Sequence, residues 1–288
     1  MSVDRLDLGD HVCWTFDDDG ERLDGMARFV TAAFGSGHRV LYATASLPPE
    51  ILLAALQVRG VEVEAATARG QLRVWPAEQL YPTGAGFDSQ AAIGRLALEV
   101  DQALAEGYRG AGIIVDMAWV RAAAVDVERL IRYEERVNTL FAGGPALGLC
   151  LYDRRLFPAA DLHRVGTAHP GTTWVEDDSA WVPLLRMHTT FDPPALRLVG
   201  EVDMSNHRAF APVLTAMRAT PNLERPPLVI DASELTFADA SAAGLLVRAA
   251  RTAPAGLQVR GCSPAVARTL ECVGAREVPG MAVTEAPA

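Results

Sequence analysis

Along the first half of the chain, short apolar runs alternate with longer segments whose apolar residues recur every three or four positions. The short runs are expected to form strands at 38–44, 70–75, 110–116 and 145–152. The longer segments are expected to form helices at 49–59, 89–106 and 126–141. Strands separated by helices predict a parallel sheet with helices on both faces.

A second alternation of the same kind fills the C-terminal part. Strands are expected at 195–203, 227–232 and 257–261, and helices at 205–219, 241–251 and 264–274. The stretch 173–187 between the two alternations contains an acidic run at 176–178 and Pro183, which is typical of a linker. The pattern therefore predicts an α/β chain with two domains, 1–172 and 188–288, joined by a linker at 173–187.

Composition narrows the class of protein. Half of the 288 residues are hydrophobic and 22% are charged, as in chains that form packed cores. No apolar run reaches the roughly 18 residues of a membrane-spanning helix, and no signal peptide is recognised, so we expect a cytoplasmic protein. The formal net charge of -10 disfavours binding to nucleic acid. The four cysteines have no CxxC spacing, and we expect them to be reduced.

Three motifs in the C-terminal part appear in a fixed order: Gly-Glu-Val-Asp at 200–203, Val-Ile-Asp at 229–231, and Leu-Thr-Phe-Ala-Asp-Ala-Ser at 235–241. Together they resemble the STAS domains of bacterial anti-sigma factor antagonists. The resemblance implies a small α/β domain in which Ser241 is phosphorylated by the anti-sigma factor, which is itself a serine kinase. A phosphatase is implied as a further partner.

The resemblance also implies a partner surface around Ser241, made of Asp203, Asp239, Ala242 and Gly244. The family usually has Ser-Ser-Gly after the acid, whereas this chain has Ala-Ser-Ala, so Ser241 is the one hydroxyl there. A serine at a helix N-terminus lies where free backbone N–H groups and the helix dipole favour a phosphate. The alternative is that Ser241 only caps the helix, because serine is a preferred N-cap residue.

The N-terminal part carries short motifs at 10–13, 37–42, 116–119, 133–138, 150–154 and 169–170. With this spacing it resembles the MEDS domain, a sensory module of bacterial and archaeal signalling proteins. The resemblance implies a RecA-like parallel sheet and a bound small molecule. The chain has no Gly-x-x-x-x-Gly-Lys-Ser/Thr run, so we expect a RecA-like domain without a P-loop and without enzymatic activity.

Seven residues are candidates for binding that small molecule: His11, Cys13, Asp116, Trp119, Cys150, Tyr152 and His169. His11 and Cys13 share one face of a strand, and with Cys150 and His169 they offer ligands for a metal or another soft ligand. The alternative is a buried cysteine beside a hydrogen-bonded histidine, since buried cysteines are commonly without function. We therefore assign no metal, no cofactor and no catalytic residue.

The sequence thus predicts a signalling regulator of two domains. The N-terminal domain is expected to sense a small molecule or a partner, and the C-terminal domain to bind an anti-sigma factor when Ser241 is unphosphorylated. The rival interpretation is a scaffold, in which the C-terminal domain forms homo-oligomers within a larger sensory complex without direct control of a sigma factor.

Overall fold

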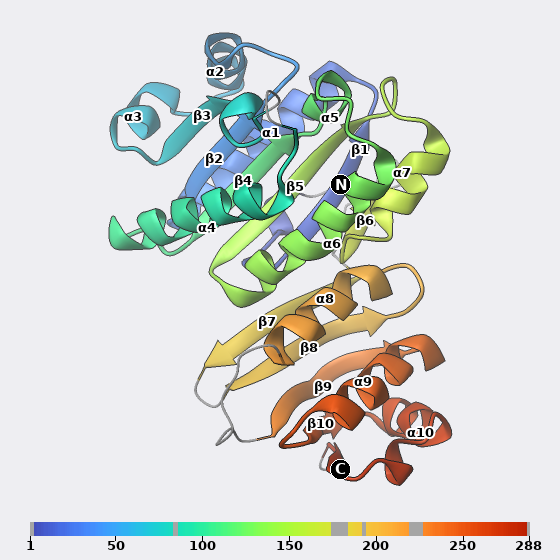
Figure 1. Cartoon of the computed structure of the whole chain (residues 1–288). Helices are drawn as coiled ribbons and strands as arrows, with labels where there is room; N and C mark the ends of the chain where they lie inside the picture. The colour runs from blue at the N-terminus through green and yellow to red at the C-terminus, as the bar shows by residue number, and fades with distance from the viewer. Residues whose placement is uncertain (1–2, 83–85, 174–183, 192–193, 219–226, 287–288) are drawn as a thin grey trace.

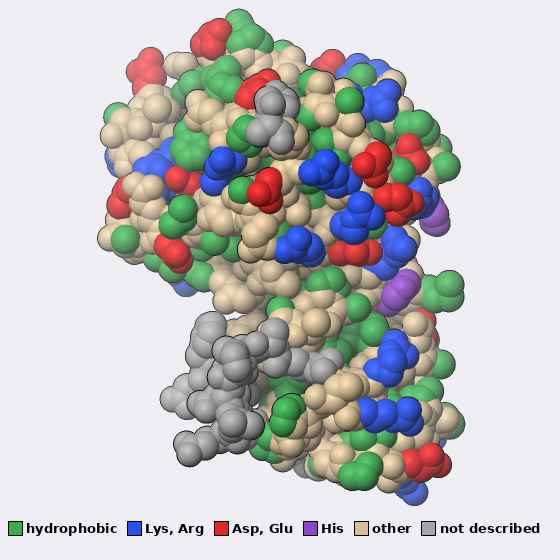
Figure 2. Space-filling view, viewed as in Figure 1, with side chains coloured by type: hydrophobic (Ala, Val, Ile, Leu, Met, Phe, Trp, Pro, Cys, Tyr) green, Lys and Arg blue, Asp and Glu red, His purple; other side chains and the backbone are tan. Residues whose placement is uncertain are grey.

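The computed structural model describes residues 3–82, 86–173, 184–191, 194–218 and 227–286. The chain forms two lobes, one for each predicted domain (Figure 1). Within the described residues, none of the helices combines the length and the apolar character that are needed to cross a bilayer. In the view of Figure 2, acidic and basic side chains are interspersed over the N-terminal lobe.

The N-terminal lobe contains a parallel sheet with the strand order β3-β2-β4-β5-β1-β6. Its strands are β1 (His11–Phe16), β2 (Arg39–Thr44), β3 (Leu72–Pro76), β4 (Ala111–Asp116), β5 (Ala146–Asp153) and β6 (Gly171–Thr173). Its α-helices are α1 (Asp19–Gly35), α2 (Pro49–Val58), α3 (Val63–Ala68), α4 (Ser89–Ala105), α5 (Trp119–Ala122), α6 (Val127–Gly143) and α7 (Ala159–Gly166). Short 3-10 turns lie at Val3–Arg5 and Ala77–Gln79.

Helices cover both faces of this sheet, as the sequence pattern predicted. One face packs against α4 and α6, and the other packs against α1 (Figure 1). Every residue of β1, β2 and β4 is buried, which is the burial expected for central parallel strands.

The C-terminal lobe contains a five-stranded sheet with the order β11-β10-β9-β8-β7. Its strands are β7 (Leu185–Phe191), β8 (Pro194–Val202), β9 (Leu228–Ala238), β10 (Leu257–Cys262) and β11 (Met281–Glu285). Its helices are α8 (His207–Arg218), α9 (Ala240–Thr252), α10 (Pro264–Cys272) and a 3-10 turn at Ala275–Glu277. Strand β7 pairs antiparallel with β8, and the other neighbours are parallel.

The expected linker at 173–187 is shorter than predicted at both ends. Thr173 ends β6 of the N-terminal sheet, and residues 185–187 already belong to β7. Residues 174–183 lie outside the described residues. Strand β7 was missed because an edge strand with alternating polar residues reads locally like a loop; its backbone pairing with β8 decides its structure.

The two lobes meet through helix α6. Ala142, near the end of α6, is buried in the hydrophobic core of the C-terminal lobe, and Glu135 forms an ion pair of 3.7 Å with Arg208 of α8. Beside this contact, Arg186 of β7 binds both carboxylate oxygens of the buried Asp10, at 2.8 and 3.1 Å. A groove of about 650 Å³ lies at the junction, between α4, α6 and α8.

Candidate functional site

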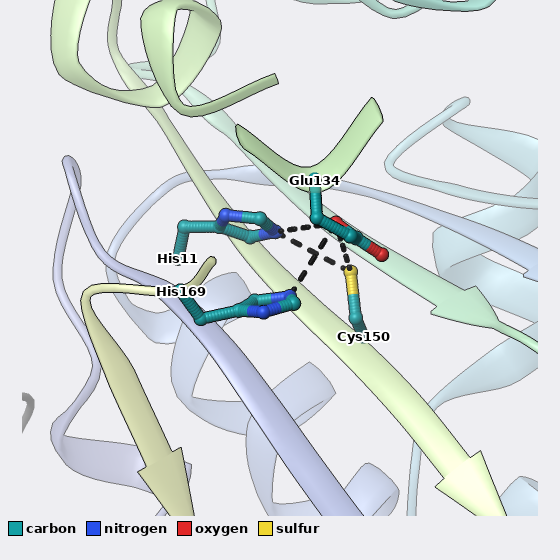
Figure 3. A group of neighbouring side chains, drawn as sticks. All are labelled: His11, Glu134, Cys150 and His169. Atoms are coloured by element: carbon teal, nitrogen blue, oxygen red, sulfur yellow. Dashed lines mark hydrogen bonds and ion pairs between the residues drawn. The ribbon is translucent and has the colours of Figure 1, made fainter. Parts of the chain in front are cut away.

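A cluster of four polar side chains lies inside the N-terminal lobe. His11 comes from β1, Cys150 from β5, Glu134 from α6, and His169 from the turn before β6 (Figure 3). Their exposed fractions are between 0 and 5%. One ligand-type atom of each residue lies within 4.8 Å of the others. So dense a group of titratable side chains in a protein interior marks a candidate functional site.

Strand register and helix spacing bring these residues together. Strands β1 and β5 are parallel neighbours, and His11 lies opposite Gly148, two residues from Cys150. Residues two apart on a strand point to the same face, so both side chains point toward α6. Glu134 and Asn138 are one helical turn apart on α6 and both point back toward the sheet.

Hydrogen bonds fix the orientation of both imidazole rings. The Asn138 amide nitrogen donates to the carbonyl oxygens of Glu134 and Ala168, at 2.7 and 2.8 Å, so its Oδ1 faces His11. His11 Nδ1 therefore donates to this oxygen at 3.0 Å, while His169 Nδ1 donates to the Val165 carbonyl oxygen at 3.0 Å. Each ring consequently turns its Nε2 toward the Glu134 carboxylate, at 3.6 Å for His11 and 3.4 Å for His169.

The electrostatics of the cluster follow from its burial. Burial, reinforced by the nearby His169, lowers the pKa of His11 to about 3, so His11 is neutral. Burial by itself raises the pKa of the Glu134 carboxyl, but His169, His11 and the Tyr152 hydroxyl outweigh it and the net shift is downward. Burial and the Glu134 charge together raise the pKa of the Cys150 thiol well above its ordinary value.

A second candidate site lies at the start of α9 in the C-terminal lobe. Asp239 is the N-cap of this helix, and its Oδ1 accepts a hydrogen bond of 2.7 Å from the Ala242 amide. Ser241 is the second residue of the helix, and its side chain is exposed. Asp203 follows the neighbouring strand β8, and the Asp239 amide donates to the Val202 carbonyl at 3.1 Å. Both acids therefore lie at the same edge of the sheet.

Comparison with known families assigns both lobes. The family model described as MEthanogen/methylotroph, DcmR Sensory domain (MEDS) matches residues 10–170, which is more than half of the chain. The chain belongs to the MEDS family. A second model, described as Mlab, STAS domain, matches residues 185–281, so a MEDS domain is fused to a STAS domain. This fusion indicates an antagonist-like or sensory role.

Comparisons with individual proteins add little to these family matches. No curated protein matches the chain. Among solved structures, the flagellar accessory protein FlaH from Methanocaldococcus jannaschii is similar, with 13% identity and a TM-score of 0.42. That match covers 71% of this chain and 82% of FlaH.

The MEDS domain brings together some, but not all, of the seven candidate ligand residues. His11, Cys150 and His169 meet in the cluster, and the Tyr152 hydroxyl donates to Glu134 Oε1 at 2.6 Å. Cys13 is buried opposite Cys150 in the β1–β5 register, beside the four clustered residues. Its place in the group of ligand-type atoms is taken by Glu134.

Asp116 and Trp119 are not among the four clustered residues, and their side chains have other partners. Asp116 ends β4, and its carboxylate accepts hydrogen bonds from the Ser46 amide and hydroxyl, at 2.8 and 2.5 Å. These bonds join the segments that follow β2 and β4. Trp119 is buried in an aromatic group, stacked on Tyr81 with the ring centroids 4.1 Å apart. The sequence could not show these partners, because Ser46 and Tyr81 come from segments far away in the chain.

One alternative and one expectation for the STAS domain also need correction. Ser241 does not cap the helix, because Asp239 occupies the cap position. Ala242 does not contribute to the partner surface, since its side chain is 1% exposed and packs in the STAS core. Gly244 is half-buried, next to Arg248.

Sequence reasoning missed Glu134 and Asn138 as site residues. The usable signal was the spacing: an acid and an amide four residues apart, flanked by Tyr133 and Val137, place polar groups next to the apolar stripe of an amphipathic helix. A buried carboxylate needs partners, which makes such a position a functional candidate.

Proposed function

We propose that the protein is a signalling regulator whose STAS domain binds an anti-sigma factor, and that phosphorylation of Ser241 by that partner's serine kinase activity disrupts the binding. The main support is the separation of two roles at the start of α9. Asp239 caps the helix, while the Ser241 hydroxyl is exposed and not required for capping. A phosphate at this position would face free helix N–H groups, which favour an anion.

The surface around Ser241 suits a partner that responds to charge. Met204, in the turn after Asp203, and Phe237, near the end of β9, are 74% and 46% exposed. Exposed apolar side chains beside acids at the same sheet edge are typical of protein interaction surfaces. A phosphate adds a charge of roughly -1.5 to -2 at pH 7, which would repel a partner surface that already contacts Asp203 and Asp239.

We further propose that the MEDS domain is the sensory input and that the chain has no catalytic activity of its own. The Asp116 carboxylate, which ends a strand as a Walker B acid does, is engaged by Ser46 and by the Ala118 amide. The sequence also has no P-loop lysine beside it.

The test measures phosphorylation and binding with purified anti-sigma factor kinases from the source organism. The cognate kinase and ATP should phosphorylate the wild type and Ser205→Ala, but not Ser241→Ala, as read by mass spectrometry. Ser205 is a matched control because it is exposed and its hydroxyl donates to Asp203. Ser241→Ala should bind the kinase at least about tenfold more tightly than Ser241→Asp, which corresponds to about 1.4 kcal/mol.

Equal affinity of the Ser241→Ala and Ser241→Asp variants would overturn the switch. A large homo-oligomer in size-exclusion chromatography, together with no kinase binding, would favour a scaffold instead.

A further inference from the structure

The four clustered residues of the MEDS domain have the spacing of a tetrahedral metal site. Zinc bonds of about 2.0–2.1 Å to nitrogen, 2.0–2.2 Å to oxygen and 2.3 Å to sulfur imply ligand-to-ligand distances of about 3.3–3.7 Å. His11 Nε2 lies 3.4 Å from Cys150 Sγ and 3.6 Å from Glu134 Oε2. Glu134 Oε2 lies 3.4 Å from His169 Nε2 and 3.8 Å from Cys150 Sγ. Four of the six edges therefore match closely, and all six are within 4.8 Å.

We infer that His11 Nε2, Glu134 Oε2, Cys150 Sγ and His169 Nε2 form a closed binding site for a zinc-class divalent transition-metal ion in the MEDS domain. Two imidazoles, one thiolate and one carboxylate suit Zn²⁺ or Co²⁺, whereas Mg²⁺ and Ca²⁺ prefer oxygen ligands. Four protein ligands and nearly complete burial leave no open position for a substrate, so the site is structural or sensory.

The hydrogen bonds that orient the candidate ligands are of the kind found around metal ligands. Each coordinating group is held from behind: His11 by Asn138, His169 by the Val165 carbonyl, and Glu134 by the Tyr152 hydroxyl. Ligating histidines almost always donate their other ring N–H in this way, because the bond fixes the tautomer and aims the lone pair. Within the described residues, His169 Nε2 has no partner of hydrogen-bond geometry, although this atom is buried.

The negative charge of the buried Glu134 carboxylate also favours a bound cation. The Glu134 carboxylate is fully buried, and the ion pairs that the described residues provide for it are with two histidines. A buried carboxylate without a compensating positive charge is strongly disfavoured. A divalent ion together with the Glu134 carboxylate and the Cys150 thiolate gives a net charge of zero. The competing explanation is a proton held between His169 and Glu134.

The experiment uses the full-length chain produced in minimal medium with either Zn²⁺ or Co²⁺. We expect about one metal ion per chain by inductively coupled plasma mass spectrometry. The cobalt protein should show the intense visible bands of tetrahedral Co²⁺ and a near-ultraviolet thiolate-to-metal charge-transfer band. The visible bands and the charge-transfer band should both be lost in Cys150→Ser. Both should be retained in Cys272→Ser, which alters an exposed cysteine of the STAS domain.

Asn138→Ser tests the positioning of His11 by its hydrogen-bonded neighbour. This variant should still bind metal, but about 10–100-fold more weakly, because loss of such outer contacts typically has this effect. A wild-type chain that folds cooperatively yet holds no metal, or a Cys150→Ser variant with an unchanged cobalt spectrum, would overturn the inference. The wild-type measurement decides the question even where a variant fails to fold. Neither result depends on the role of Ser241, so this inference and the proposed function fail separately.

Discussion

Two residues at the start of α9, separated by Ala240, have separate roles. Asp239 satisfies the helix through its bond to the Ala242 amide, whereas Ser241 points to solvent. The carboxylate also lies at the positive end of the helix dipole, which adds to its stabilising effect. A side chain that is not needed for folding can be modified without loss of the fold, which is what a reversible switch requires.

This division predicts different stabilities for two alanine variants. Asp239→Ala should lower the free energy of unfolding by about 1 kcal/mol, because the helix loses its N-cap. Ser241→Ala should change it by less than about 0.5 kcal/mol, as is usual for an exposed side chain. Urea denaturation followed by circular dichroism measures both. Equal losses for the two variants would mean that Ser241 also supports the helix.

Helix α6 connects the two domains, because one of its faces packs on the MEDS sheet and another contacts the STAS domain. Glu134, Asn138 and Phe141 point to the sheet of the MEDS domain, and the Phe141 ring stacks on His11 with the centroids 4.6 Å apart. Glu135 and Ala142 face the STAS domain. Helix α8, which contacts α6, begins shortly after Asp203, so one helix connects this contact to the part of the STAS domain that contains Asp203.

Helix α6 packs closely against the sheet at Gly148, because glycine has no side chain there to meet the Phe141 ring. A Cβ there would lie 2.4 Å from Phe141 Cζ, so Gly148→Ala should displace the ring and destabilise the MEDS domain by about 1–3 kcal/mol. Gly143→Ala is the matched control, because a Cβ at the end of α6 meets no other atom within 4 Å. Thermal unfolding should show a lower melting temperature for the first variant and an unchanged or higher one for the second. A neutral Gly148→Ala would show that Phe141 can move freely.

At the scale of the whole molecule, a single buried carboxylate helps to join the lobes. Asp10 is fully buried, and burial raises its pKa to about 6 despite the opposing influence of Arg186. Arg186 also donates to the Arg5 carbonyl oxygen at 3.1 Å, so it ties β7 of the STAS domain to two points of the MEDS domain. Helix α6 adds to this junction through its contacts with α8 and β7.

Removal of this arginine should loosen the junction. Arg186→Gln leaves Asp10 buried without its cation and should destabilise the chain by about 3 kcal/mol, the usual effect of breaking a buried ion pair. Arg197→Gln is the control: its pair with Glu234 is nearly half exposed and should contribute less than about 1 kcal/mol. Calorimetry of both variants provides the comparison. Similar melting profiles for the two would show that Asp10 is stable without Arg186.

The sequence alone was sufficient for the architecture and the families. The spacing of apolar residues along each segment indicates which of its faces is buried. This local information predicted two α/β units and the parallel N-terminal sheet. The motifs around Ser241 and those between residues 10 and 170 were also local, and the family models match the same two regions. The spacing of Glu134 and Asn138 within α6 was also local information, although it was not recognised as a site.

Only the tertiary structure decided which residues share a site. The order β3-β2-β4-β5-β1-β6 inserts the first strand between β5 and β6, which brings His11 next to Cys150, 139 positions away. Asp116 lies on β4 next to β5, but its side chain points to the opposite face, where it contacts Arg22 of α1 and Ser46. Strand order depends on how whole layers pack and on connections far apart in the chain. The strand order therefore cannot be predicted from the periodicity of a single segment.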